Sequence, residues 1–223
     1  MNDLIESAWK CYRSIQGDFI VKPSIPILYF GDRDKYLKSS LRIVTVGLNP
    51  SKIEFPQKAI FSRFISAENI NLELVDNNEE SRIQYLNSLN SYFRIDPYKK
   101  WFKFYEKVLN GLDCSYYDIN ENTALHIDIF SVLATNPTWS ECKIEYQAKL
   151  SVYGIDLWHK LILNLSPNII ILSIAHEHLK RIRFHKIQDW ISISHEIIGI
   201  EKDYNIDLGI FEIQPHNKCL IFW

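Results

Sequence analysis

The hydrophobic pattern of the chain changes repeatedly between helical spacing and short continuous apolar runs. Apolar residues three and four positions apart predict amphipathic helices, whereas a run of four to six apolar residues bounded by turn signals predicts a buried strand. The predicted helices cover residues 3–15, 76–92, 97–109 and 140–165, the last capped by Ser140, and the predicted strands cover residues 42–46, 124–130, 168–173, 191–200 and 208–214.

This order of elements predicts an α/β fold. Strands separated by helices favour a parallel sheet, because a helix carries the chain back to the edge at which the next strand begins. We therefore expect a three-layer α/β/α sandwich with a mainly parallel central sheet of about four strands. The sequence has no linker-like stretch, so we expect one domain over residues 1–223.

A polar turn directly follows the strand at 42–46. Gly47 permits a sharp exit from the strand, Asn49 tolerates turn conformations, and Pro50 prevents the strand from continuing. Open α/β sheets bind ligands beyond the carboxyl ends of their strands. On its own the pattern favours a simple polar turn, and the alternative is an asparagine that is displayed to a ligand.

Polar residues also occur in and after the other two central strands. His126, Asp128 and Phe130 alternate onto one side of the strand at 124–130, and burial of such polar groups is costly without partners. Structural hydrogen bonds are one explanation, and a site is the other. Since His176 follows the strand at 168–173, three polar turns are expected at one sheet edge, which favours a site.

The most basic stretch of the chain comes after His176. It contains Lys180, Arg181, Arg183 and Lys186 and is a candidate clamp for the phosphate backbone of DNA. The His176-Glu-His178 pattern lacks a third ligand at a recognisable spacing, so we predict no metal.

Helix 97–109 carries Lys99, Lys100, Lys103 and Lys107. Such a flank is usually a solvated face, with contact to DNA as the alternative. We expect the apolar face of this helix to consist of Trp101, Phe104, Tyr105, Val108 and Leu112.

Composition narrows these possibilities. The 223 residues are 47% hydrophobic with a formal net charge of −2, so any contact with nucleic acid must come from a local patch. The four cysteines are scattered and form no close pair, which argues against a disulfide framework and an iron–sulfur cluster and favours the cytoplasm. The charged first residues do not resemble a secretory signal, and no apolar run is long enough to span a membrane.

Several motifs resemble the uracil-DNA glycosylase superfamily. Residues 46–51, Val-Gly-Leu-Asn-Pro-Ser, resemble its first motif in the Gly-x-Asn-Pro form of the mismatch-specific and single-strand-selective branches. Residues 127–133 resemble the second strand, which ends in the base-reading pocket, and 168–175 resemble a later strand. Residues 214–217 match the histidine-containing loop more loosely. The resemblance extends over roughly residues 25–220.

This resemblance implies a monofunctional, cofactor-free DNA glycosylase that acts on a flipped-out base as a monomer, in base-excision repair. Asn49 is expected to position the attacking water. His216, or alternatively His176, is expected to donate a hydrogen bond to the departing base. Asp128 is a further expected catalytic side chain. Substrate contacts are expected from Gly47, Leu48, Pro50, Ser51, Phe130 and Ser131.

The sequence also departs from the family pattern. Uracil-excising relatives usually read the base with an asparagine near the end of the second strand, where this chain offers Asp128, Phe130 and Ser131. An ionised Asp128 only accepts hydrogen bonds, which suits an exocyclic amine. We therefore extend the hypothesis to a modified cytosine, as in hypermodified viral DNA attacked by an antiviral defence enzyme. The alternatives are a DNA-binding module without catalysis and an α/β enzyme acting on free nucleosides or nucleotides.

Overall fold

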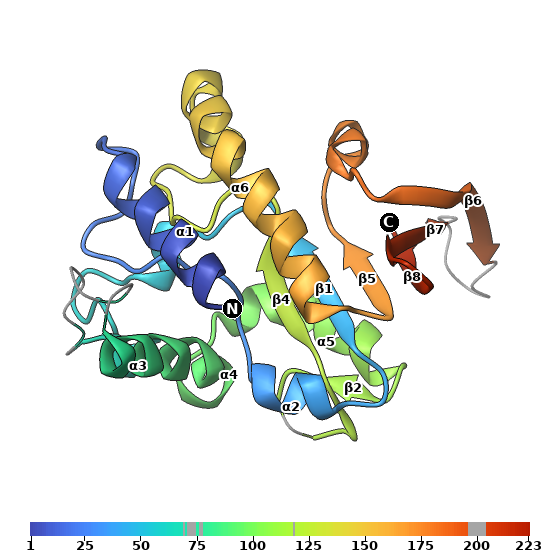
Figure 1. The fold of residues 1–223 in the computed structure, drawn as a ribbon, viewed down its shortest axis with the longest axis horizontal. Helices are drawn as coiled ribbons and strands as arrows, with labels where there is room; N and C mark the ends of the chain where they lie inside the picture. The colour runs from blue at the N-terminus through green and yellow to red at the C-terminus, as the bar shows by residue number, and fades with distance from the viewer. Residues whose placement is uncertain (69, 71–74, 76–77, 118, 196–203) are drawn as a thin grey trace.

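A six-stranded sheet forms the centre of the molecule (Figure 1). The computed structural model describes all residues except 69, 71–74, 76–77, 118 and 196–203. The strand order is β4-β1-β5-β8-β7-β6. The bounds are β1 Ile43–Gly47, β4 Leu125–Asp128, β5 Ile169–Leu172, β6 His185–His195, β7 Tyr204–Gln214 and β8 Asn217–Phe222. The predicted α/β class is confirmed, whereas the predicted number of about four strands is too small.

Four of the six strands are parallel. β1 lies between β4 and β5, with Gly47 opposite Asp128 and Val46 opposite Leu172, and β5 pairs with β8 in parallel. β7 and β6 add an antiparallel extension. β5, Ile-Ile-Ile-Leu, is a continuous apolar run, as is typical of a parallel strand that is covered on both faces.

The antiparallel extension explains the error in the number of strands. The strands predicted at 191–200 and 208–214 overlap β6 and β7, but β6 begins earlier, at His185, and β8 is a further strand beyond the turn at Pro215 and His216. The end of the predicted strand at 191–200 lies outside the described residues, as do the first two residues of the helix predicted at 76–92.

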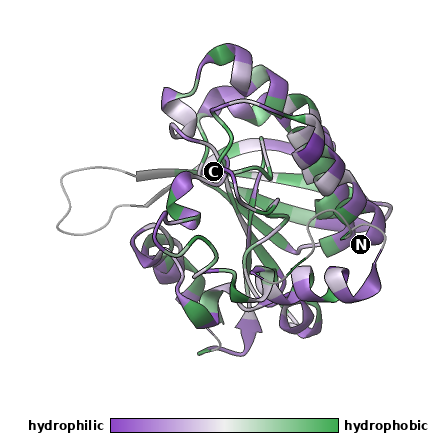
Figure 2. Ribbon diagram, turned by 90° about the vertical axis from the view of Figure 1, so that its left-hand side faces the viewer, coloured by the Kyte–Doolittle hydropathy of each residue, from purple (hydrophilic) through white to green (hydrophobic). Residues whose placement is uncertain are grey.

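Helices flank the sheet. In Figure 1, α1 and α6 lie in front of the sheet and α5 lies behind it, and Figure 2 shows helices on both sides of the strands. The helices are α1 Asn2–Ser14, α2 Arg33–Lys38, α3 Glu79–Asn90, α4 Tyr92–Ile95, α5 Lys99–Asn110 and α6 Ile144–Leu165. Short 3₁₀ helices are η1 Lys52–Glu54, η2 Ile65–Ala67, η3 Trp139–Glu141 and η4 His176–Arg181, and β2 Cys114–Ser115 pairs with β3 Asn122–Thr123.

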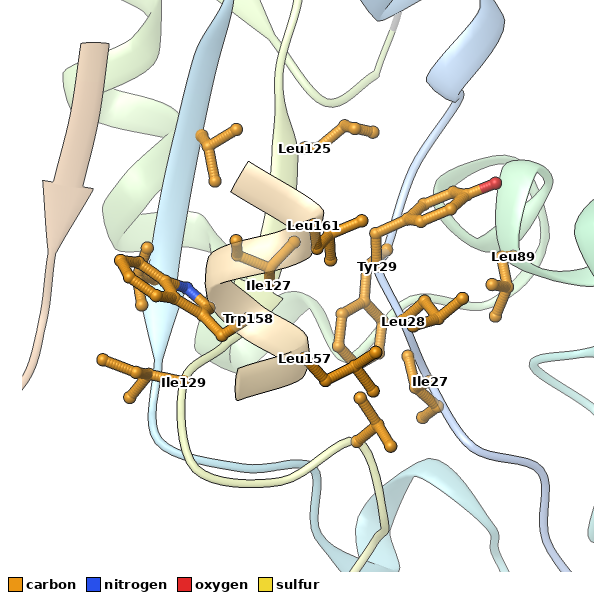
Figure 3. Packing of buried hydrophobic residues seen from close by; sticks show 14 of the residues in the cluster. Ile27, Leu28, Tyr29, Leu89, Leu125, Ile127, Ile129, Leu157, Trp158 and Leu161 are labelled. Atoms are coloured by element: carbon orange, nitrogen blue, oxygen red, sulfur yellow. The ribbon is translucent and has the colours of Figure 1, made fainter. Parts of the chain in front are cut away.

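The hydrophobic core lies between α6 and the strands. Figure 3 shows Leu157, Trp158 and Leu161 of α6 packed towards Ile127 and Ile129 of the β4 segment. In the described part of the chain, no helix is long and apolar enough to cross a membrane.

Two helix boundaries differ from the prediction. Ser140 does not cap α6, because it lies in η3 and the extended backbone of Cys142 separates the two helices. Likewise α5 starts at Lys99, after Pro97. Asn78 caps α3, since its side chain accepts a hydrogen bond from the Ser81 amide.

The buried face of α5 also differs from the prediction. The helix buries Phe102, Tyr105 and Leu109. Of the five residues predicted to face the core, only Tyr105 does so, because α5 has two adjacent apolar rows and helical spacing alone does not tell which row is buried. The exposed row consists of Trp101, Phe104, Val108 and Leu112, which are 45%, 63%, 52% and 37% exposed.

Candidate active site

A cavity of about 250 Å³ opens at the carboxyl ends of β1, β4 and β5. Its walls come from the turn after β1, the end of β4, the start of α5 and the segment around η3. This is the edge of a parallel sheet at which α/β proteins bind ligands. The predicted gathering of polar turns around Asn49 and Asp128 is confirmed, since both residues line this cavity.

Gly47 allows two buried polar side chains to approach the end of β1. A Cβ atom at this position would lie 2.6 Å from Asp128 Oδ1 and 3.0 Å from His126 Nε2. Any larger residue would displace these side chains, which both line the cavity. Gly47 therefore shapes the site from behind and does not line the cavity itself.

His126 is fixed by a chain of buried polar groups. The hydroxyls of Tyr116 and Thr45 are hydrogen-bonded, and Thr45 Oγ1 lies 2.7 Å from His126 Nδ1. The other ring nitrogen of His126 lies 3.7 Å from Asp128 Oδ1. The chain runs from the interior to the cavity and holds the imidazole ring against the Asp128 carboxylate.

Asn49 is held with its carbonyl oxygen available. Its Nδ2 donates hydrogen bonds to Pro50 O at 2.7 Å and to Thr135 Oγ1 at 2.8 Å. Among the described residues, no donor forms a hydrogen bond with Asn49 Oδ1. This oxygen is therefore an acceptor that is fixed in position at the cavity and suited to holding a water molecule.

Glu54 is a second buried carboxyl group on the cavity wall. Burial raises its pKa to about 7, and the nearby charge of Asp128 acts in the same direction. A hydrogen bond of 2.7 Å from the Tyr92 hydroxyl and the charge of Arg63 partly oppose this rise. A carboxyl group with this pKa exchanges its proton near neutral pH, which is the property required of a general acid or base.

We expect Glu54→Gln to change how stability depends on pH. From pH 4.5 to about 7 the folded protein keeps a proton on Glu54 that the unfolded chain releases. Wild-type stability should therefore fall as pH rises through this window, by up to about 3 kcal/mol, and then level off. The glutamine variant lacks this loss and still accepts the Tyr92 hydrogen bond. It should gain stability relative to wild type from pH 5 to pH 8.

Urea unfolding of both proteins at pH 5 and at pH 8 measures this difference in stability. Glu80→Gln, which changes an exposed carboxylate at the start of α3, is the matched control and should behave as wild type. If the Glu54→Gln and wild-type stabilities change in parallel with pH, Glu54 does not hold a proton at neutral pH.

Aromatic rings form much of the remaining wall. Phe30, Tyr98, Trp101, Phe102 and Trp139 all line the cavity. Flat apolar rings beside a few polar groups are suited to a planar heterocyclic ligand, which stacks on the rings and forms hydrogen bonds at its edge.

Some predicted substrate contacts lie elsewhere. Leu48, Pro50 and Ser51 line the cavity as predicted, but Phe130 and Ser131 do not. The Phe130 ring stacks on Trp139 at 5.1 Å, and Ser131 Oγ is buried in hydrogen bonds with the Leu133 backbone. Phe130 instead lines a second cavity, which also contains Trp139.

The prediction that His216 shares this site is wrong. It occupies the turn between β7 and β8, with a φ of +66°. Because β8 runs parallel to β5, this turn lies at the amino edge of the sheet, where the Asn217 side chain donates to Ser166 Oγ. His216 and Asn49 are therefore at opposite ends of the strands.

His176 lies at the expected sheet edge but not in the cavity. Its ring packs against Trp223 at 5.1 Å, beyond the end of β8. The histidine that lines the cavity is His126, whose position next to Asp128 was visible in the alternation of the strand. Glu54 had no such signal, because it sits in the irregular region that follows Pro50.

The basic stretch forms a smaller cationic surface than predicted. Lys180, Arg181 and Arg183 line a second cavity of about 510 Å³, which shares Trp139 with the first. Arg183 is paired with Asp156, and Lys186 with Asp189. Lys180 and Arg181 remain, in the described part of the chain, without an ion-pair partner.

Comparisons with protein-family models, with curated proteins and with solved structures find no match for this chain. Among the described residues, no three histidine, cysteine, aspartate or glutamate side chains are grouped so that they could hold a metal ion.

Proposed function

We propose that the protein is a DNA glycosylase with a three-layer α/β/α fold, which hydrolyses the N-glycosidic bond of a flipped-out non-canonical base. The observation that carries this proposal is the cavity at the carboxyl ends of the parallel strands. It combines the carboxyl groups of Glu54 and Asp128 with the Asn49 amide between aromatic walls. The resemblance of residues 46–51 to the first motif of the uracil-DNA glycosylase superfamily supports the same reaction.

The size and lining of the cavity support a single base as ligand. Its volume of about 250 Å³ is below the range typical of drug-sized ligands. An enzyme that acts on a base within DNA takes the base out of the stack, which costs a few kcal/mol. Stacking on rings such as Phe102 and Trp139 offsets part of this cost.

The polar groups support a hydrolytic mechanism. Asn49 Oδ1 accepts a hydrogen bond from water, and the Asp128 carboxylate takes the proton of that water as its oxygen bonds to C1′ of the sugar. The C1′–N bond breaks with its electron pair going to the base, and protonated Glu54 transfers its proton to the departing base. His126 keeps Asp128 oriented. A pKa of Glu54 near 7 suits an acid that works at neutral pH.

The remaining polar residues of the cavity support a pyrimidine as the excised base. Thr138, Ser140 and Ser173 also line the cavity, and a hydroxyl group can donate or accept a hydrogen bond at the edge of a base. On its hydrogen-bonding edge, cytosine has an amine donor next to a ring-nitrogen acceptor. Uracil has a ring N–H donor next to a carbonyl acceptor. Uracil and a modified cytosine, as in hypermodified viral DNA, are therefore the substrates that we propose.

A strand-cleavage assay tests this function. Purified protein is incubated with oligonucleotides that carry uracil, thymine mismatches or modified cytosines, and abasic sites are then cleaved with alkali. Cleavage at one of these bases would support the proposal and name the substrate. Binding to DNA without an abasic site on any substrate would instead favour a binding module.

A further inference from the structure

One helix carries an apolar row on the outside of the molecule. Trp101, Phe104, Val108 and Leu112, called here the α5 stripe, follow each other at helical spacing along and just past α5. All four are more than a third exposed, and the Phe104 side chain is 63% exposed. Scattered exposed apolar residues are common on proteins, but a continuous row of them marks a contact surface.

A row of lysines runs beside the α5 stripe. Lys100, Lys103 and Lys107 are exposed, and Lys103 Nζ lies 4.8 Å from the centre of the Phe104 ring. No ion pair involves these lysines within the part of the chain that the structure describes. The Glu106 carboxylate is turned away, towards Ser115 Oγ and the Tyr116 amide. The surface is therefore aromatic, and it carries positive charges that no ion pair with the described residues neutralises.

The α5 stripe continues from the candidate active site. Trp101 lines the cavity and is also 45% exposed, so it lies at the rim. With a rise of about 1.5 Å per residue, Phe104 follows about 5 Å further along the helix and Val108 about 11 Å from Trp101. A chain of nucleotides that has one base in the cavity would therefore meet this surface as it leaves.

We propose that the α5 stripe and its lysine row bind single-stranded DNA next to the flipped base. Unpaired bases stack on Trp101 and Phe104, and phosphates lie near Lys100, Lys103 and Lys107. Stacking platforms beside a cationic track are the usual means of binding single strands. In a duplex the base faces already stack on one another, so they have no surface to offer these rings. This inference deepens the proposed function and rests on it for the position of the strand.

Fluorescence anisotropy with a labelled thymine 20-mer tests the inference. Phe104 is well exposed and does not line the cavity, so Phe104→Ala should leave the fold intact. We expect it to raise the Kd about tenfold, equivalent to about 1.4 kcal/mol, which is within the range for stacking of one base on an aromatic ring. Tyr153→Ala, which removes an exposed ring from α6, is the matched control and should bind as wild type.

Salt dependence provides the second readout. A Lys103→Gln, Lys107→Gln double variant should reduce the slope of log K against log salt by about 1.4, because each phosphate contact to a single strand contributes about 0.7. Wild-type affinity for Phe104→Ala, or equal wild-type affinity for the 20-mer and its duplex, would overturn the inference. So would a wild-type dimer in sedimentation that Phe104→Ala converts to a monomer.

These results are independent of excision. The 20-mer contains only an ordinary base and the readout is binding, so the α5 stripe can be supported even if no glycosylase activity is found. An Asp128→Asn variant should lose excision and keep this binding.

Discussion

Asp128→Asn is expected to lower the rate of base excision by about 10²–10⁴-fold, the usual contribution of a general base. The carboxylate lies at the end of β4, where its strand register places it opposite Gly47. It is the group proposed to take the proton from water. An asparagine amide has nearly the same shape but is no longer an effective base, so the variant should fold and bind DNA.

Single-turnover cleavage of the preferred oligonucleotide measures this effect, and thermal unfolding checks the fold. Asp34→Asn is the matched control, because Asp34 is an exposed carboxylate on α2 and does not line the cavity. We expect its rate to equal that of wild type. If Asp128→Asn also retains the wild-type rate with an intact fold, Asp128 is not the base and the proposed mechanism is wrong.

Gly154→Ala is expected to lower the free energy of unfolding by about 4 kcal/mol or more, or to prevent folding. Gly154 lies inside α6, where a Cβ atom would be 1.9 Å from the Phe130 carbonyl oxygen and 2.8 Å from the Ser131 amide nitrogen. Both contacts are with backbone, so no change of rotamer relieves them. The helix would have to move away from the segment after β4, which opens the core shown in Figure 3.

Urea unfolding measures the loss of stability. Gly111→Ala is the control, because Gly111 ends α5 with a φ of −67° and its nearest added contact is the Val108 carbonyl at 3.4 Å. This control should remain within about 1 kcal/mol of wild type. If Gly154→Ala is about as stable as wild type, α6 packs less closely against the segment after β4 than described.

The sequence indicated the core of the site because parallel strands bring their carboxyl ends together. The β-branched run at residues 43–46 and the polar residues around Asn49 and Asp128 could be placed at one sheet edge before the structure was known. His126 was part of the same alternation. Local pattern was sufficient here, since the direction of each strand followed from the helices between them.

Local pattern was insufficient where tertiary contacts decide. His216 lies in a two-residue turn that can only join antiparallel strands, but the direction of β7 and β8 relative to β1 is decided in the folded sheet, so the sequence did not show at which edge His216 lies. Glu54 lies in a single 3₁₀ turn without periodicity, and only the folded chain brings it to Tyr92 and Asp128. In the same way, the two apolar rows of α5 are distinguishable only once one of them is packed.

Release of a free base from DNA tests the central claim most directly. Wild-type protein and Asp128→Asn are incubated with the substrate panel and with viral DNA that carries hypermodified bases, and the soluble fraction is analysed by mass spectrometry. We expect wild type to release one intact free base in amounts equal to the abasic sites formed, and Asp128→Asn to release almost none. Binding of wild type to these DNAs without any free base in solution would contradict the proposal that this cavity breaks N-glycosidic bonds.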